Sequence, residues 1–399
     1  MSTIKKMKYN PLSGEIEYAA DTPIEGGGAV NPTATKNAVT FYDYDGTILY
    51  SYTAEEFRSL TEMPPLPTQP GLVCQEWNWD YKEALAYVYE YGVLDVGATY
   101  ITDDGKTRLY IRIAAKGRMD VPLHFQQTVA NGVTIDWGDG TPTETLDGTG
   151  NVNATHHYNA IGDYMISLDV AEGCTLVLGH NSDSIGVIGG SDSAYKRILY
   201  KAEIGLGIMS LNYAFTGMRT LASVTIPKSI NASGNRAFAE SILLSCVIIP
   251  NSITNISSEW LEKSRVGVVS LPRSITTTGS IFRSCELLST VVIPPNITEI
   301  SSLCFYLSYG LISLVFPKGI KTIGSNSFAY CTIMAFYDFS HLTAVPRLEN
   351  TNAFTSIPSD CKIIVPDALY DEWIVATNWS TYASYIIKKT DWDASKNNQ

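Results

Sequence analysis

The most constraining feature of the sequence is a row of prolines that recurs every 22 or 23 residues. The members of the row are Pro227, Pro250, Pro272, Pro294 and Pro317. Each one ends a short apolar run, such as Val247-Ile-Ile-Pro or Val291-Val-Ile-Pro. Proline ends a β-strand because it has no N–H to donate to the strand ladder. The period therefore predicts a stack of coils in which each coil contributes one short β-branched strand to a parallel sheet.

Two further series keep the same phase as the prolines. Aromatic residues recur at Phe215, Phe238, Trp260, Phe282, Phe305 and Phe328, and isoleucines recur at Ile230, Ile253, Ile275, Ile297 and Ile320. One coil is too small to bury its own apolar face, so neighbouring coils must stack to make a continuous core. We interpret both series as structural positions, with each aromatic residue filling the side of the coil opposite the strand.

This repeat resembles the BspA-like leucine-rich repeats of bacterial and phage surface proteins. The unit of that family reads as an aromatic residue, a cysteine, a leucine, a strand, Ile-Pro and a second isoleucine. Phe282-Arg-Ser-Cys285, followed by Val-Val-Ile-Pro294, fits this order, and so does Phe328-Ala-Tyr-Cys331. The resemblance implies a leucine-rich-repeat β-solenoid over residues 199–365. It implies no particular ligand, because such solenoids bind many partners or act as spacers.

Charge and hydropathy limit the class of partner. The 399 residues carry a formal net charge of −12, which argues against a nucleic-acid partner because phosphate binding needs a basic face. The N-terminus lacks the apolar segment of a signal peptide, and no apolar run is long enough to span a bilayer. We therefore expect no membrane partner.

The seven cysteines form an odd-numbered set without the paired Cys-x-x-Cys spacing of a zinc site. Cys285 and Cys331 hold the same position in coils two repeats apart. Stacked strands lie about 4.8 Å apart, which puts these two residues about 10 Å apart and too distant for a disulfide. We expect buried, reduced core thiols.

The chain before the solenoid divides into four parts by motif and composition. We predict an N-terminal arm over 1–36, a small α+β module over 37–116, a β-sandwich over 117–178 and a linker over 179–198. The module should contain a helix that Asn78 or Asp80 caps and Gly92 ends. Strands over 95–102 and 107–114 should pair as a hairpin through Asp104-Gly105.

The chain after the solenoid should form a cap and a tail over 366–399. Asp367 is placed to cap a helix that carries Leu369, Trp373 and Ile374 on one face. The polar tail from Lys388 onward is expected to fray. The whole chain is thus predicted to be a mainly β, multidomain protein with a C-terminal solenoid and a helical cap.

Residues 117–178 resemble a polycystic-kidney-disease (PKD) type, immunoglobulin-like β-sandwich. The residues that carry the resemblance are Trp137, Gly138, Asp139 and Gly140, then His156 and Tyr158, then Tyr164. The adjacent His157 should point to the opposite face of the strand from His156, so the two histidines do not form a metal pair. The resemblance implies a spacer or an adhesive domain.

The segment Asp43-Tyr-Asp45-Gly46-Thr is open to two interpretations. It matches the first motif of haloacid-dehalogenase-type phosphatases, in which Asp43 would be the nucleophile and Asp45 the acid/base. Asp-Gly between two apolar strands also predicts a hairpin turn. The turn is favoured because a phosphatase needs a further Ser or Thr, a Lys and a distal acidic pair. The Asp103-Asp104 pair sits in a segment that itself reads as a hairpin.

These features favour a non-enzymatic protein without cofactor or metal. The leading hypothesis is a bacteriophage virion protein, made in the host cytoplasm, that serves as a head fibre, capsid decoration or tail fibre. Its N-terminal part would attach to capsid or tail proteins, and its repeats would contact host-surface or mucus glycans or proteins. A homo-oligomer is possible but not enforced by any heptad. The alternatives are a bacterial BspA-type cell-surface adhesin and, more remotely, a phosphatase that uses Asp43 and Asp45.

Overall fold

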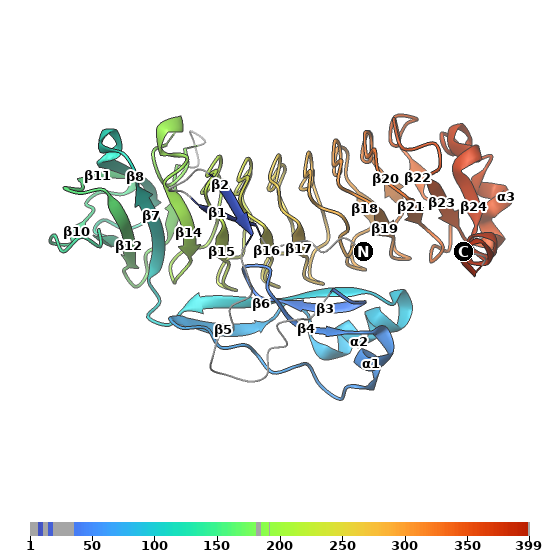
Figure 1. Ribbon diagram of the computed structural model, residues 1–399, viewed down its shortest axis with the longest axis horizontal. Coiled ribbons are helices and arrows are strands. Elements are labelled where there is room, and N and C mark those ends of the chain that lie inside the picture. The colour runs from blue at the N-terminus through green and yellow to red at the C-terminus, as the bar shows by residue number, and fades with distance from the viewer. Residues whose placement is uncertain (1–6, 11–14, 19–35, 181–184, 191, 398–399) are drawn as a thin grey trace.

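The computed structural model describes residues 7–10, 15–18, 36–180, 185–190 and 192–397. Figure 1 shows a long solenoid with a β-sandwich at one end, a helical cap at the other end and a small α+β module along one side. Most of the predicted arm over 1–36 lies outside the described residues. Within the arm, β1 (Met7–Asn10) and β2 (Glu15–Tyr18) pair as an antiparallel hairpin.

The module is a four-stranded sheet of order β4-β3-β6-β5 with two helices. Its elements are β3 (Val39–Tyr42), β4 (Ile48–Tyr52), α1 (Ala54–Ser59), β5 (Leu72–Trp77), α2 (Tyr81–Tyr91) and β6 (Leu94–Thr102). The predicted helix is confirmed. Of its two candidate caps, Asp80 accepts from the N–H of Glu83, and Gly92 ends the helix with a left-handed φ of 73°.

The predicted pairing of residues 95–102 with 107–114 is wrong. β7 (Thr107–Ile113) leaves the module and enters a six-stranded sheet of order β10-β9-β12-β7-β14-β15. The turn itself forms at Gly105, but Asp103 and Asp104 bind Arg108 at 2.8 and 3.0 Å, and the two strands diverge. In the structure the module sheet therefore ends at Thr102, and the strand that follows belongs to the sandwich.

The sandwich packs the six-stranded sheet against a second sheet of order β11-β8-β13. Its remaining elements are η1 (Lys116–Arg118), β8 (Asp120–Gln127), β9 (Val133–Asp136), β10 (Glu144–Thr145), β11 (Gly150–His157), β12 (Gly162–Val170), β13 (Leu176–Leu178) and β14 (Leu199–Glu203). β14 pairs antiparallel with β7 and parallel with β15 (Ser223–Thr225), the first solenoid strand. One hydrophobic core consequently runs from the sandwich into the solenoid.

The segment 179–198, predicted as a linker, packs against both neighbouring domains in its described part. Its described part contains η2 (Ser193–Tyr195), and Val187, Ile188 and Ile198 are buried in the shared core. The N–H of Val187 also donates to the carbonyl of Ala214 in the first coil, at 3.0 Å. These contacts fix the angle between the sandwich and the solenoid.

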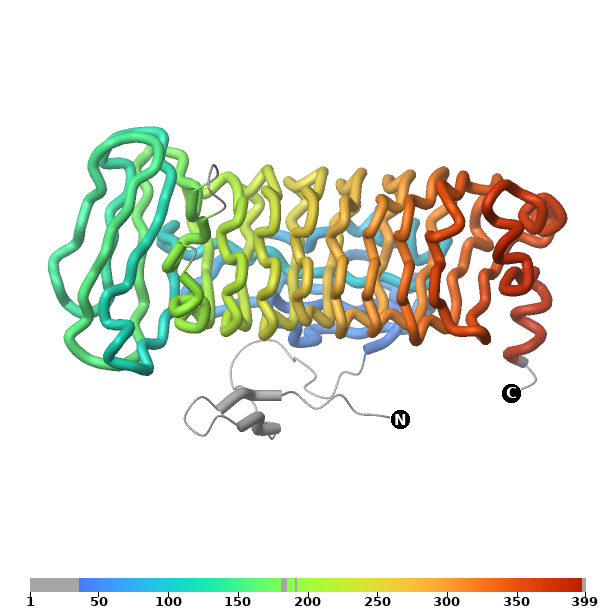
Figure 2. Tube along the Cα trace, turned by 90° about the horizontal axis from the view of Figure 1, so that it is seen from above, coloured from blue at the N-terminus to red at the C-terminus, as the bar shows by residue number. Residues whose placement is uncertain are grey.

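The solenoid carries two rows of short parallel strands, visible as evenly stacked coils in Figure 2. One row continues from β15 through β16 (Cys246–Ile248), β17 (Val268–Ser270), β19 (Ser313–Val315), β21 (Phe336–Asp338), β23 (Lys362–Val365) and β24 (Ile386–Lys388). The other consists of β18 (Glu299–Ile300), β20 (Thr322–Ile323) and β22 (Arg347–Leu348). The run Val291-Val-Ile, predicted as a strand, forms no ladder, so the ladder of the first row is interrupted between β17 and β19, as it is between β15 and β16.

The prolines leave backbone carbonyls without a partner inside the stack. Ile248 pairs with Ser270, so Ile249 lies opposite Leu271, and the N–H of Ile249 donates to the carbonyl of Ser270 at 3.1 Å. Parallel pairing then directs the Ile249 carbonyl toward the nitrogen of Pro272, which has no hydrogen to donate. Pro294 and Pro317 follow Pro272 at spacings of 22 and 23 residues and hold the same position in the next two coils.

The module supplies the missing donors. Three of its side chains donate to these carbonyls: Asn78 to Ile249 at 3.0 Å, Trp79 to Leu271 at 2.9 Å and Tyr87 to Ile293 at 3.0 Å. All three side chains are buried. A buried carbonyl without a partner costs about 1–3 kcal/mol. The module and the solenoid therefore stabilise each other.

Close packing and ion pairs complete this contact. Gly97 in β6 lies on Ile248, where an added Cβ would come within 2.3 Å of a side-chain methyl. Arg273 binds Glu83 at 2.8 Å at the rim of the contact. The module thus covers the proline side of the solenoid and, as Figure 1 shows, leaves the opposite side open.

The C-terminal cap differs from the prediction in two ways. It consists of η3 (Asp367–Leu369), α3 (Tyr370–Trp373), η4 (Trp379–Tyr385) and α4 (Lys389–Asn397). Asp367 caps no helix, because its carboxylate accepts from the N–H and hydroxyl of Thr390 at 3.1 and 2.6 Å. The predicted fraying is not seen in the described part of the tail, which ends at Asn397: β24 joins β23, and the Trp392 ring in α4 lies 5.3 Å from that of Phe336.

Candidate functional site

The repeat positions lie inside the coils and are not available to a ligand. All six aromatic residues and all five prolines of the two series are buried. Phe282 stacks on Phe305 with ring centroids 5.0 Å apart, and Phe305 stacks on Phe328 at 5.4 Å. Phe354 extends this ladder, at 5.2 Å from Phe328. The sequence series missed Phe354 because it lies 26 residues after Phe328 and because Ser340 stands where the proline of the Phe328 unit is expected.

The cysteines are core groups, as predicted. All seven are free, and six are buried, the exception being the partly exposed Cys74 in β5. Burial raises the pKa of Cys285, Cys304 and Cys331 to about 12. A thiol with so high a pKa stays neutral at physiological pH and is a poor nucleophile or metal ligand.

The residues of the predicted PKD-like motif pack against one another inside the sandwich. Trp137 stacks on His156 at 4.8 Å, and the carbonyl of Trp137 accepts from the Tyr158 hydroxyl at 2.8 Å. The Tyr158 and Tyr164 rings lie 4.2 Å apart. Gly138 has a φ of 74° and lies against the Met165 backbone, so no side chain fits there. Gly140 also has a left-handed φ, of 83°.

Asp139 links the turn after β9 to His156 of the neighbouring strand. Its carboxylate lies 2.7 Å from His156 Nε2 and 2.6 Å from the Thr141 hydroxyl. Partial burial opposes the charged form, but the bonds from Thr141 and His156 prevail and lower the pKa of Asp139 to about 2. His157 faces away and binds Asp120, as the alternation of the strand predicts. The arrangement holds the turn after β9 in place.

The Asp43 segment forms the predicted hairpin between β3 and β4. The N–H of Asp43 donates to the carbonyl of Thr47 at 2.8 Å, and its carboxylate accepts from Gln69 Nε2 at 2.5 Å. The carboxyl group of Asp43 is buried, which raises its pKa, whereas Asp45 is exposed in the turn. Within the described part of the chain, no group of three or more His, Cys, Asp or Glu side chains is arranged to hold a metal ion.

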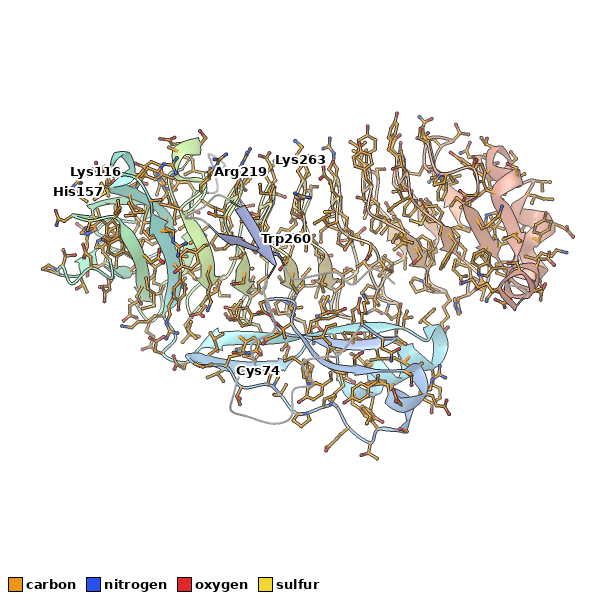
Figure 3. All side chains as sticks on the ribbon, in the orientation of Figure 1. Cys74, Lys116, His157, Arg219, Trp260 and Lys263 are labelled. Carbon is orange, nitrogen blue, oxygen red and sulfur yellow. The ribbon has the colours of Figure 1, made fainter. Side chains whose placement is uncertain are left out.

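The open side of the solenoid is formed by the turns that follow each aromatic residue; we call this surface the turn edge. Interstrand-type bonds bracket each turn: Gly217 donates to Ala239 on one side, and Gly267 donates to Ser245 on the other, at 2.7 and 2.9 Å. The turns consequently stack in register along the axis. Figure 3 shows Arg219 and Lys263 on this edge, opposite the module that carries Cys74.

The turn edge exposes apolar side chains at recurring positions. Those more than a third exposed are Ile242, Leu243, Leu287, Tyr309, Ile312, Tyr330 and Ile333. Leu243, Leu287 and Ile333 each lie five residues after the aromatic of their coil. Exposed apolar side chains that line up over several coils are typical of an interaction surface.

The turn edge also carries cations. Arg197, Arg219, Lys263 and Arg265 are exposed, and none has an ion-pair partner among the described residues. The neighbouring Arg236 and Arg283 differ, because they are held by Glu259 and Glu262 just below the edge. This surface is therefore basic and apolar in a chain whose net charge is −12.

A groove of about 480 Å³ lies at the cap end, between β22 and the segment from Glu372 to Trp379. The strand edge inside it is already occupied. Trp379 Nε1 donates to the carbonyl of Pro346 and Asn378 Nδ2 to that of Leu348, both at 2.7 Å. These bonds close the groove to strand addition and identify it as part of the cap.

The repeats match a known family. Residues 211–335 fit the family model of the BspA type leucine rich repeat region in six copies. The mainly β chain thus contains a C-terminal solenoid of the leucine-rich-repeat type. A search of curated proteins found no match. In the described part of the chain, no helix has the length and hydropathy to cross a membrane.

Two solved structures show similar repeats. One is a leucine-rich repeat protein from Bacteroides ovatus, with 22% identity over 41% of this chain and a TM-score of 0.32. The other is the T. pallidum leucine rich repeat protein, with 24% identity over 43% of this chain and a TM-score of 0.33. The chain covers 48% of the first protein and 78% of the second.

Proposed function

We propose that the chain is a non-enzymatic adhesion protein that contacts its target through the turn edge of its BspA-type solenoid. The observation that carries this proposal is the division of the solenoid surface. The proline side is covered by Asn78, Trp79 and Tyr87 of the module, whereas the turn edge presents its aligned apolar and basic side chains to solvent. The sandwich, fused through β14, acts as a rigid spacer.

The proposed setting is the surface of a bacteriophage particle, as a head fibre, capsid decoration or tail fibre. The free state of all seven cysteines supports folding in a reducing compartment such as the host cytoplasm. The N-terminal region would attach the protein to capsid or tail proteins. A bacterial BspA-type surface adhesin is the second candidate, favoured by the family match of residues 211–335.

Adhesion is tested with beads that carry the purified protein and are mixed with a panel of gut bacterial cells. The double variant Leu287→Ser with Ile333→Ser removes two exposed apolar side chains without touching the core, and retention on cells should fall at least tenfold. Val375→Ser is the matched control, because Val375 is exposed on the cap, away from the turn edge. Retention unchanged by the double variant would refute the proposal.

The setting is tested by immunogold labelling of purified phage particles with an antibody to the repeats. Label on the capsid or the tail is expected for a virion protein. Label confined to the bacterial envelope would replace this setting with the surface adhesin.

A further inference from the structure

We propose that the turn edge binds a segment of a partner protein that combines acidic and apolar side chains. The proposal rests on the adhesive role of this edge and adds the chemistry of its target. The edge as defined above carries four exposed cations, Arg197, Arg219, Lys263 and Arg265, and seven exposed apolar side chains.

The turn edge is rigid because backbone hydrogen bonds join each of its turns to the turns of the neighbouring coils. The N–H of Arg219 donates to the carbonyl of Lys196 at 2.7 Å, which sets Arg197 and Arg219 side by side in successive coils. Further along, the N–H of Ile312 donates to Ser289 at 2.8 Å. Side chains in successive coils are thus held about 4.8 Å apart. Such a surface loses little conformational entropy when a partner binds.

The charges of the edge select an acidic partner. Among the described residues of these turns, the exposed carboxylates are those of Glu286 and of Asp192, which precedes Arg197, and Glu240 is bound by Arg236 at 3.6 Å. The guanidinium groups of Arg197, Arg219 and Arg265 present paired donors that match the two oxygens of a carboxylate. Because the chain as a whole is strongly acidic, this edge is where an acidic segment meets complementary charge.

The apolar side chains of the edge select a protein over an acidic polysaccharide. Leu243, Leu287 and Ile333 are 40%, 44% and 52% exposed. Aliphatic groups of this kind gain free energy by burial against other apolar groups, not against sugar hydroxyls. Tyr309 and Tyr330, together with the arginines of the first coils, add the residue types that are enriched at protein interfaces. The partner segment should therefore pair its carboxylates with the first coils and its apolar residues with the later ones.

The test is to pan a random 12-residue peptide display library on the immobilised full-length protein. Selected peptides should be enriched in Asp and Glu together with Leu, Ile, Phe or Trp, and their affinity should fall as salt is raised. The pair Arg219→Glu with Arg265→Glu should weaken a selected synthetic peptide at least tenfold, and so should Leu287→Ser with Ile333→Ser. Lys82→Glu, an exposed cation on α2, and Val375→Ser should bind it as the wild type does.

Three results would overturn the inference: selected peptides without acidic enrichment, equal binding to both edge variants, or binding of hyaluronan that depends on Arg219 and Arg265 but not on Leu287. The last result would mean that the edge recognises an acidic polysaccharide. In each of these cases the bead assay still tests adhesion by itself. If retention on cells depends on the turn edge, the adhesive function holds even though the proposed partner chemistry is wrong.

Discussion

At the residue scale, the contact between the module and the solenoid depends on backbone carbonyls that directly precede prolines of the row. The recurring prolines leave acceptors of the stack without a backbone donor, and the acceptors of Ile249, Leu271 and Ile293 are satisfied from the module. Asn78 makes the most hydrogen bonds of the three donors. Its Nδ2 also donates to Ser270, and its Oδ1 accepts from the N–H of Gly97 at 2.8 Å.

Replacing Asn78 with alanine should destabilise the protein by about 3 kcal/mol, because buried carbonyls and the N–H of Gly97 lose their partners together. Asn296→Ala is the matched control: Asn296 makes one exposed bond, to the carbonyl of Arg273. Urea denaturation measures both. Equal midpoints for the two variants would contradict the role given to Asn78.

Asp43 predicts a specific pH dependence. Burial raises the pKa of its carboxyl group above the usual value, so the folded state holds this proton more tightly than the unfolded state does. The stability contributed by Asp43 is therefore fully present below the unfolded pKa of about 3.9 and is lost as pH rises through the folded pKa. Asp43→Asn stays neutral and avoids this loss.

Relative to the wild type, Asp43→Asn should thus gain stability as pH rises from about 4 to 7. Denaturant titrations at several pH values give the difference in unfolding free energy between the two proteins. A difference for Asp43→Asn that is flat, or that shrinks with rising pH, would show that burial does not raise the pKa of Asp43.

At the element scale, stacked aromatic rings join successive coils inside the solenoid. Phe305 is fully buried between Phe282 and Phe328, and Phe305→Ala should cost about 4 kcal/mol through the lost burial and the cavity left behind. Tyr309→Ala, on the exposed edge of the same coil, should cost less than about 0.5 kcal/mol. Guanidinium denaturation followed by circular dichroism compares them. Similar costs would mean that the ladder does not carry the stack.

Local sequence signals predict single elements but not how distant elements pair. The helix over 81–91 was predictable from its cap Asp80 and its terminating Gly92, both of which are local signals. The Asp104-Gly105 signal is equally local, and it gave the turn but not the pairing, since β7 finds its partners in β12 and β14. The tail helix α4 was missed because its support, the contact of Trp392 with Phe336, joins distant residues.

At the scale of the whole molecule, the repeat made the solenoid and its buried positions predictable, because each coil repeats one pattern. The docking of the module was not predictable. Its bonds join residues such as Asn78 and Ile249, 171 positions apart, and nothing near Asn78 distinguishes a docking residue from a helix cap. The turn edge escaped the sequence reading for a related reason: its side chains become a surface only once the opposite side is covered.

The docked state can be tested with one glycine. Gly97→Ala places a methyl group against Ile248 and should lower stability by about 2 kcal/mol or more, since the packed contact has no room for it. Gly117→Ala, where a Cβ meets open space, is the control. Thermal unfolding reports both. A neutral Gly97→Ala would mean that the module does not rest on the solenoid.

The most direct test of the account is hydroxyl-radical footprinting of the protein, free and bound to bacterial cells. Oxidation of Leu287, Tyr309 and Ile333 on the turn edge should fall on binding, whereas the exposed Tyr89 on the module should react equally in both states. Protection of Tyr89 with an unchanged turn edge would show that the protein binds through its module and would contradict the central claim.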